Sequence, residues 1–201
     1  MFRLTEPSPR ILERMHKTLA GAAPSFPFVG ATRVARPPEG YYGDRQRLRI
    51  GWGEGAFHRA ARALRAWSMF ATEWTRVYPE DSPLEAGADV LVLVRLGALW
   101  TIHPARIVEL IEEETEKHRR FGFAYATLPG HALVGEERFV IEQVKEDNSV
   151  WYELLAYSRP AWMLARLAPP LVRMWQKQFG ADSKRAMGRA MAAAEERDGE
   201  P

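Results

Sequence analysis

Six short segments with the alternation of β-strands follow one another between residues 74 and 158, and no helical segment separates them. Strand side chains point alternately to the two faces of a sheet, so a half-buried strand alternates apolar and polar residues. Short connections rich in turn residues favour antiparallel pairing of neighbours, and a doubly wound parallel sheet is not expected. The predicted strands are Trp74–Tyr78, Asp89–Leu96, Leu99–Glu113, Arg119–Leu128, Gly135–Val144 and Ser149–Ser158.

A seventh strand and a helix are predicted before this series. The residues of Tyr42–Ile50 alternate arginines with less polar side chains, which indicates a strand with one solvated face. In Ala56–Phe70, apolar residues recur every three or four positions, as in an amphipathic helix. Nearer the N-terminus, Ser8–Ala20 has the same helical spacing, and the proline- and glycine-rich residues 21–43 predict an irregular arm.

The C-terminal part, residues 160–194, predicts one long helix. The prolines Pro169 and Pro170 interrupt its backbone hydrogen bonds, but the apolar stripe stays in phase across them, so we expect a kinked helix packed along one surface. Gly180 is expected to end the main helix, with a further amphipathic turn beyond it. The stripe consists of Leu164, Leu167, Leu171, Trp175 and Phe179.

This order of elements predicts an α+β helix-grip fold, in which a curved antiparallel sheet of about seven strands wraps a long C-terminal helix. Such an arrangement buries the helix stripe and leaves space between helix and sheet. We expect one helix-grip domain over residues 41–194, preceded by a helix and arm in residues 1–40 and followed by an acidic tail, residues 195–201.

The composition of the chain excludes several kinds of site and partner. The chain of 201 residues has no cysteine, so disulfides, thiolate metal sites and a cysteine nucleophile are excluded. Residues 1–20 interleave charges with apolar residues and lack the unbroken apolar run of a signal peptide, so we expect a cytoplasmic protein. The formal net charge of +2 gives no reason to expect a nucleic-acid partner.

Three stretches carry a family resemblance: Phe28–Thr32, Gly122–His131 together with Gly135–Phe139, and Ser158–Ala161. They resemble the uncharacterised protein family UPF0548, which is distantly similar to the START and Bet v 1-like helix-grip superfamily. The resemblance implies a cavity for an apolar or amphipathic ligand between sheet and helix, and no established activity. The chain departs from the expected pattern at Ala126, where glycine is expected, and at Ala132 and Leu133, where a proline and an acidic residue are expected.

A glycine motif, Gly51-x-Gly53-x-x-Ala56, follows a strand and precedes a helix, as in dinucleotide-binding proteins. The preceding strand alternates with arginines, however, whereas a central parallel strand is apolar on both faces. We therefore interpret the motif as a strand-to-helix turn that requires small residues, and we expect no cofactor.

The candidates for acid–base chemistry are His131 and Glu137, near the Pro129–Gly130 turn. Glu137 shares a strand face with Phe139, so it points toward the apolar side and needs a partner such as an inward arginine or tyrosine. An imidazole beside a carboxyl group can act as an acid–base pair, but both residues can equally hold the loop together by hydrogen bonds. No spacing typical of metal ligands is present, and we expect no metal.

Arg45, Arg47 and Arg49 form a basic ladder on one strand face. They could contact phosphate or an anionic lipid, but the usual structure of such a ladder is a solvated face paired across strands. The alternate residues of this strand offer no aromatic ring, which argues against nucleic-acid binding. The C-terminal helix is also cationic and amphipathic, so weak contact with an anionic membrane is an alternative to docking on the sheet.

Aromatic residues make up 11% of the chain. Large rings on a concave sheet face leave gaps that suit a flat or chain-like apolar ligand, although plain core packing is the competing explanation. The predicted ligand-binding residues are Trp100, Phe121, Phe123, Tyr125, His131, Glu137, Phe139, Trp151, Tyr157, Leu164, Leu167, Leu171 and Trp175.

Three functions remain open from the sequence. The first is a non-enzymatic module that holds a lipid, isoprenoid or polyketide-like molecule. The second is a hydrolase, isomerase or cyclase that acts on such a ligand with His131 and Glu137. The third is a peripheral membrane or partner-binding protein that uses the basic C-terminal helix.

Overall fold

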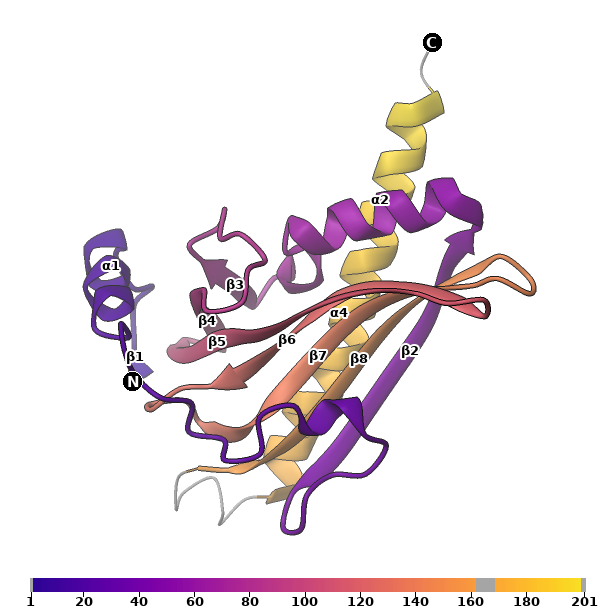
Figure 1. The fold of residues 1–201 in the computed structure, drawn as a ribbon. Helices are drawn as coiled ribbons and strands as arrows, with labels where there is room; N and C mark the ends of the chain where they lie inside the picture. The colour runs from indigo at the N-terminus through magenta and orange to yellow at the C-terminus, as the bar shows by residue number, and fades with distance from the viewer. Residues whose placement is uncertain (1, 162–168, 200–201) are drawn as a thin grey trace.

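The structure is a computed structural model that describes residues 2–161 and 169–199 (Figure 1). Short elements open the chain: strand β1 (Phe2–Arg3), helix α1 (Pro9–Lys17) and the 3₁₀ turn η1 (Ala31–Arg33). The remaining elements are β2 (Tyr42–Trp52), α2 (Gly53–Arg65), η2 (Ser68–Phe70), β3 (Thr75–Tyr78), β4 (Asp89–Leu96), β5 (Leu99–Glu114), β6 (His118–Thr127), β7 (Leu133–Val144), β8 (Ser149–Pro160) and α4 (Pro169–Gly199).

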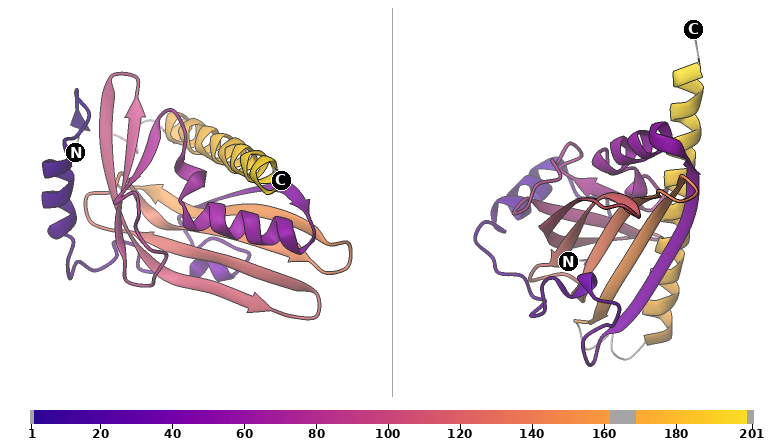
Figure 2. Two further views of the ribbon diagram at one scale, coloured as in Figure 1. Left: turned by 90° about the horizontal axis from the view of Figure 1, so that it is seen from above. Right: turned by 45° about the vertical axis from the view of Figure 1, so that its right-hand side comes forward.

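One antiparallel sheet contains every described strand. Its order is β2-β8-β7-β6-β5-β4-β3, and β1 pairs with β5 off this path. The seven strands predicted from the sequence are all present, and their ends shift by at most two residues. Along this path, β2 is out of chain order, because it pairs with β8 at the edge opposite β3. The sheet curves around helices α2 and α4, which gives the helix-grip fold (Figure 2).

Helix α2 fills one part of the concave face. Phe57, Ala60, Ala61 and Leu64 form its buried stripe and pack in the main core with side chains of β6, β7 and β8. The helix ends at Arg65, earlier than predicted, because Trp67 adopts a left-handed backbone conformation and η2 follows. This turn inserts Trp67, Met69 and Phe70 into the same core.

Helix α4 runs through Gly180, so the prediction that this glycine ends the helix is wrong. A Cβ atom at Gly180 would lie only 2.7 Å from the Cγ atom of Gln46, so glycine allows the helix to approach β2 closely. The helix continues to Gly199, and Arg59 of α2 pairs with Glu195 and Asp198. Leu164 and Leu167 of the predicted stripe lie outside the described residues. The predicted kink at Pro169 and Pro170 falls at the first residues of α4, so only its C-terminal side is described. Among the described residues, no helix is long and apolar enough to cross a membrane.

The N-terminal segment packs on the outer face of the sheet, opposite α2 and α4 (Figure 1). Leu12 and Leu19 join a second apolar cluster with side chains of β4 and β5. Farther along the arm, Phe26 and Tyr41 pack on Ala126 of β6 in a third cluster. The arm is therefore ordered against the domain, as expected from its sequence.

Candidate functional site

The candidate site lies on one transverse row of the concave face. In this row Tyr125 of β6 pairs with Glu137 of β7, Glu137 pairs with Ala156 of β8, and Ala156 pairs with Asp44 of β2. Directly paired residues point to the same side of a sheet, so a phenol and two carboxyl groups share this face. Ala156 has a small side chain and separates the two acids.

The hydroxyl group of Tyr125 donates a short hydrogen bond to Oε2 of Glu137. Glu137 thus points to the apolar side, and of the two expected kinds of partner, an inward arginine or a tyrosine, the structure shows the tyrosine. Burial raises the pKa of Glu137, the Tyr125 hydrogen bond opposes this effect and the nearby Asp44 carboxylate adds to it, so that the pKa is about 7. Burial, with the charge of Glu137, also raises the pKa of Tyr125 well above its usual value.

Three side chains of this region lie deep in the protein and yet keep partial exposure: Glu137, His103 and His131. Each of these side chains is therefore partly accessible. We call the partly accessible region of the concave face around Glu137 the hollow. Helix α4 reaches the same face, where Gln176 donates to the Ser158 hydroxyl group.

Polar contacts of α4 continue along this face. The hydroxyl groups of Tyr152 and Ser183 are 2.6 Å apart and share a hydrogen bond. The Lys184 ammonium donates to Oε1 of Gln46 at 2.9 Å, and the Gln46 amide donates to Asp44 at 3.1 Å. Asp44 and Tyr152 were not among the predicted site residues. Strand parity was the available signal, because Asp44 shares a face with Gln46, Leu48 and Ile50.

His131 lies beside His103, with ring centroids 4.9 Å apart. Nδ1 of His131 accepts the Leu133 amide at 2.9 Å, so the proton of the neutral ring is on Nε2. Burial lowers the pKa of His131 well below its usual range, and that of His103 to about 4. No hydrogen bond or ion pair joins His131 to Glu137, both of which the structure describes. The structure therefore gives each residue a different partner.

The predicted aromatic residues divide between the two faces. Phe121, Phe123 and Phe139 lie on the concave face within the main core. The Phe123 ring stacks on Phe139 at 5.2 Å and meets Trp67 edge-on at 5.0 Å. These rings pack against α2 and η2, so core packing accounts for them, and Tyr125 marks the boundary between this core and the hollow.

Three predicted ligand-binding residues lie on the outer face instead, so the prediction that they face the space between sheet and helix is wrong. Trp100 packs with Leu12 and Leu19 of the N-terminal segment. The Trp151 ring lies beneath the Arg47 guanidinium, 4.5 Å from its centroid. The Tyr157 hydroxyl group donates to the Val34 carbonyl of the arm. The number of aromatic residues does not predict on which face of the sheet each one lies. Alternation along β8 does, because Trp151 and Tyr157 point to the face opposite Tyr152 and therefore away from the hollow.

The predicted helix residues are only partly described. Leu164 and Leu167 lie outside the described residues, and Leu171 is described only as part of the α4 backbone. Trp175 is half-buried and borders a groove of about 1010 Å³ between α4 and the segment before β3. Its ring centroid lies 5.9 Å from that of Trp74.

Glu136, next to Glu137 in the chain, points to the opposite face. Its carboxylate accepts three hydrogen bonds, from the Gly30 amide at 2.6 Å, the Thr32 amide at 2.9 Å and the Thr32 hydroxyl group at 2.6 Å. Gly30 has a φ of 90°, in the region that favours glycine. Two stretches of the family resemblance thus meet here, and Glu136 fixes the arm to the sheet.

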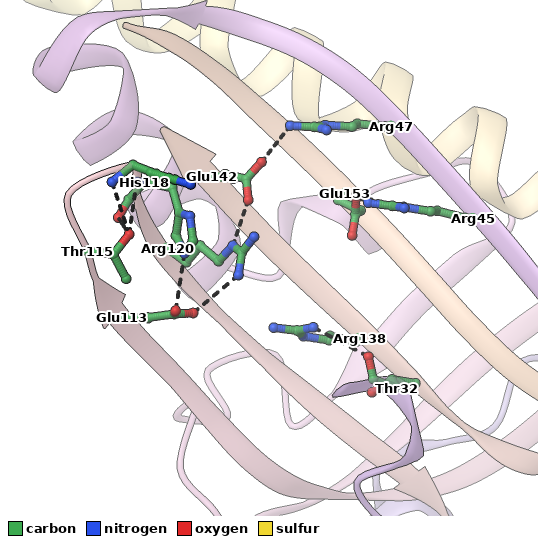
Figure 3. A network of polar contacts seen from close by, with 11 residues as sticks. Thr32, Arg45, Arg47, Glu113, Thr115, His118, Arg120, Arg138, Glu142 and Glu153 are labelled. Carbon is green, nitrogen blue, oxygen red and sulfur yellow. Dashed lines mark hydrogen bonds and ion pairs between the residues drawn. The ribbon is translucent and has the colours of Figure 1, made fainter. Parts of the chain in front are cut away.

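Two of the three ladder arginines on the outer face, Arg45 and Arg47, pair across strands as predicted (Figure 3). Arg45 pairs with Glu153 at 2.6 Å, and Arg47 with Glu142 at 2.5 Å. Arg120 continues the network between Glu142 and Glu113. Aromatic rings from other positions also face the ladder: Trp151 enters it from the neighbouring strand, and the Trp52 ring lies 4.4 Å from the Arg49 guanidinium.

Fold and site together define a protein of the helix-grip class, with a polar group embedded in an otherwise apolar concave face. The structure of Ara h 8.0201 shares this Bet v 1-like fold, with a TM-score of 0.51 and 11% identity, over 77% of this chain and 99% of that chain. This likeness shows the fold alone.

Sequence comparison identifies the family. A family model described as a domain of unknown function (DUF1990) matches residues 25–186. A UPF0548 protein of Deinococcus radiodurans is 34% identical over 200 residues, 94% of this chain and 98% of the relative. A UPF0548 protein of Dictyostelium discoideum is 33% identical over 157 residues, 75% of this chain and 73% of the relative. The chain belongs to this family.

Proposed function

We propose that the protein binds a hydrophobic or amphipathic small molecule between its sheet and helix α4, with the polar end of that molecule at Tyr125 and Glu137. The observation that carries this proposal is Glu137 itself, a carboxyl group deep in the protein that keeps an accessible side chain. A protein that needed only a core would fill this position with an apolar side chain, since burying a carboxyl group is costly.

The surroundings of Glu137 suit such a ligand. Phe139 and Tyr125 supply apolar ring surface on one side, with centroids 5.7 Å apart. The neutral His131 ring offers an N–H donor, and the Tyr125 and Glu137 groups offer further polar contacts. Few polar groups within an apolar surface are typical of small-molecule sites, where they fix the orientation of the ligand.

Native mass spectrometry and tryptophan fluorescence with farnesol and decanol test this proposal. We expect saturable binding of at least one alcohol with one molecule per chain. The variant Ala156→Leu places a larger side chain in the row between Glu137 and Asp44 and should weaken binding by about tenfold or more. Leu155→Met, on the other face of the same strand, is the matched control and should bind like the wild type. Binding that is absent in wild type, or unaffected by Ala156→Leu in a folded variant, would contradict the proposal.

A second candidate function is acid–base catalysis on the bound molecule, and the pKa of Glu137 near 7 favours it. Glu137 replaces the predicted His131–Glu137 pair as the candidate, because no hydrogen bond joins the two described side chains. In this reaction Glu137 takes a proton from carbon next to a ligand carbonyl and returns it. Deuterium exchange into 2-decanone in D₂O, followed by NMR, should then be faster with wild type than with Glu137→Gln. Equal exchange with both proteins excludes this function for such ketones.

A further inference from the structure

We propose that the molecule bound in the hollow carries a basic nitrogen, and that Glu137 holds this nitrogen in its ammonium form beside Asp44. This inference rests on the proposed function and specifies the chemical class of the ligand. It is carried by the distribution of charge around the row Tyr125–Glu137–Ala156–Asp44.

The acids of this row lack a cationic partner within the described part of the chain. Neither Glu137 nor Asp44 takes part in an ion pair there, although the outer face of the same strands is rich in them. Strand parity sends the arginines of β7, β8 and β2 outward: Arg138 donates to the Thr32 carbonyl, Arg159 lies over the Tyr41 ring, and Arg45 pairs with Glu153. The concave side of three adjacent strands thus keeps its carboxyl groups without their arginines.

Among the side chains that the structure describes, one cation contacts this row, through Gln46. From β6 and β8 come Tyr125 and Tyr152, which are neutral, and α2 presents apolar residues such as Leu64. Helix α4 brings Lys184, whose ammonium group is bound to Gln46 rather than to either acid. With both acids ionised, this group of residues therefore carries one negative charge more than it carries positive charge.

A ligand completes this arrangement best if it is a cation. An ammonium group has three N–H donors and no acceptor, so it can bond the Glu137 carboxylate and a further acceptor of the row. A carboxylate ligand would meet two acids, and like charges at close range are unfavourable. An alcohol could hydrogen-bond to Glu137 but would leave its charge without a partner.

Proton release follows from this binding mode. Burial holds the pKa of Glu137 at about 7, so the free protein is largely protonated there below that pH. An ammonium ligand binds the ionised form and displaces the proton, so its affinity should rise as the pH increases from 5.5 to 7.5. The rise should approach tenfold per pH unit well below pH 7, whereas an alcohol should show no such rise.

Calorimetric titration with decylamine, decanol and decanoic acid tests the inference, because these probes share one chain length and differ in their polar group. At pH 7.5 we expect decylamine to bind about tenfold more tightly than decanol, and decanoic acid most weakly. Glu137→Gln should reduce the preference for decylamine over decanol to about twofold or less while decanol still binds. Glu153→Gln removes an acid from the outer face and should leave the preference unchanged.

The possible results distinguish failure of the basic-nitrogen inference from failure of the proposed binding function. If decanol or decanoic acid binds as tightly as decylamine, or if Glu137→Gln keeps the preference, the basic nitrogen is overturned and the proposed binding function stands. If none of the three probes binds, with binding of farnesol also absent, the proposed function itself is overturned. Titration in two buffers of different ionisation enthalpy must also show release of about one proton with decylamine near pH 6. Its absence counts against Glu137 as the partner.

Discussion

Two neighbouring glutamates on β7 show that a shift of one residue along a strand moves a side chain to the other face of the sheet. Glu136 is 1% exposed and accepts three hydrogen bonds from the arm, whereas Glu137 faces the hollow on the other side of the sheet. Alternation along β7 sends one outward and the other inward. Neither acid forms an ion pair with an arginine or lysine of the described residues. Glu136 is bound by three donors of the arm, whereas Glu137 is bound by the single phenol of Tyr125.

Replacing Glu137 should stabilise the protein at high pH. Because the folded pKa is raised from 4.5 to about 7, the folded protein holds a proton that the unfolded chain loses between those values. The stability that this group contributes is present below pH 4.5 and is lost as the pH rises through about 7. Relative to wild type, Glu137→Gln should therefore gain about 2 to 3 kcal/mol in unfolding free energy between pH 4.5 and pH 8.

Urea unfolding at several pH values measures this gain, and the same substitution at the exposed Glu146 is the control. A difference between Glu137→Gln and wild type that does not change with pH would show that folding does not raise the pKa of Glu137.

Replacing Glu136 should release the arm. In Glu136→Gln the amide group cannot accept all three hydrogen bonds of Gly30 and Thr32, so we expect a loss of about 2 to 4 kcal/mol. Limited proteolysis within residues 21–41 should become faster at the same time. Glu153→Gln breaks a pair with an exposed arginine and should cost about 1 kcal/mol or less. Equal losses in the two variants would contradict the assigned role of Glu136.

The orientation of Glu137 could be predicted from the sequence because strand parity is a local property, whereas an arginine or a tyrosine was equally open as its partner. The state of His131 could not, since it depends on the Leu133 amide and on His103, which lies on β5. The placement of Trp100 on the outer face likewise depends on packing by α1. Such contacts between distant parts of the chain leave no local pattern.

At the scale of elements, the strands were predictable and the helix ends were not. Each strand carries its alternation and its turn residues in its own sequence, and β4 agrees with its predicted range at both ends. The helix ends differ from the prediction at Gly180 and Trp67 because tertiary contacts determine them. Gly180 allows α4 to approach Gln46, and Trp67 donates its indole N–H to the Ser82 carbonyl. Local propensity is a weak guide where packing imposes another conformation.

Two glycines test this difference between strand and helix positions. In β6, a Cβ atom at Gly122 would lie 2.2 Å from the Phe139 carbonyl oxygen, so Gly122→Ala should destabilise the protein by about 1 to 3 kcal/mol. In α4, nothing lies within 4 Å of a Cβ atom at Gly188, and Gly188→Ala should stabilise by about 0.5 to 1 kcal/mol. Thermal unfolding of both variants checks the signs. A destabilised Gly188→Ala variant would indicate that α4 is not helical at this position.

At the scale of the whole molecule, the two faces of the sheet have different tasks. The outer face pairs its arginines with glutamates and takes the N-terminal segment, so its charges are satisfied locally (Figure 3). The concave face packs against α2 and α4 and contains Glu137 and Asp44, which form no ion pair with any described residue. The acids that face the helices therefore differ from those of the arginine network, which pair across strands on the outer face.

The crystal structure of the protein with the tightest-binding of the three decyl probes tests the central claim most directly. Our account predicts one probe between the sheet and α4, with its polar atom within hydrogen-bond distance of the Glu137 carboxyl group. A probe ordered only in the groove between Trp74 and Trp175, with the Glu137 side chain free of it, would contradict the account.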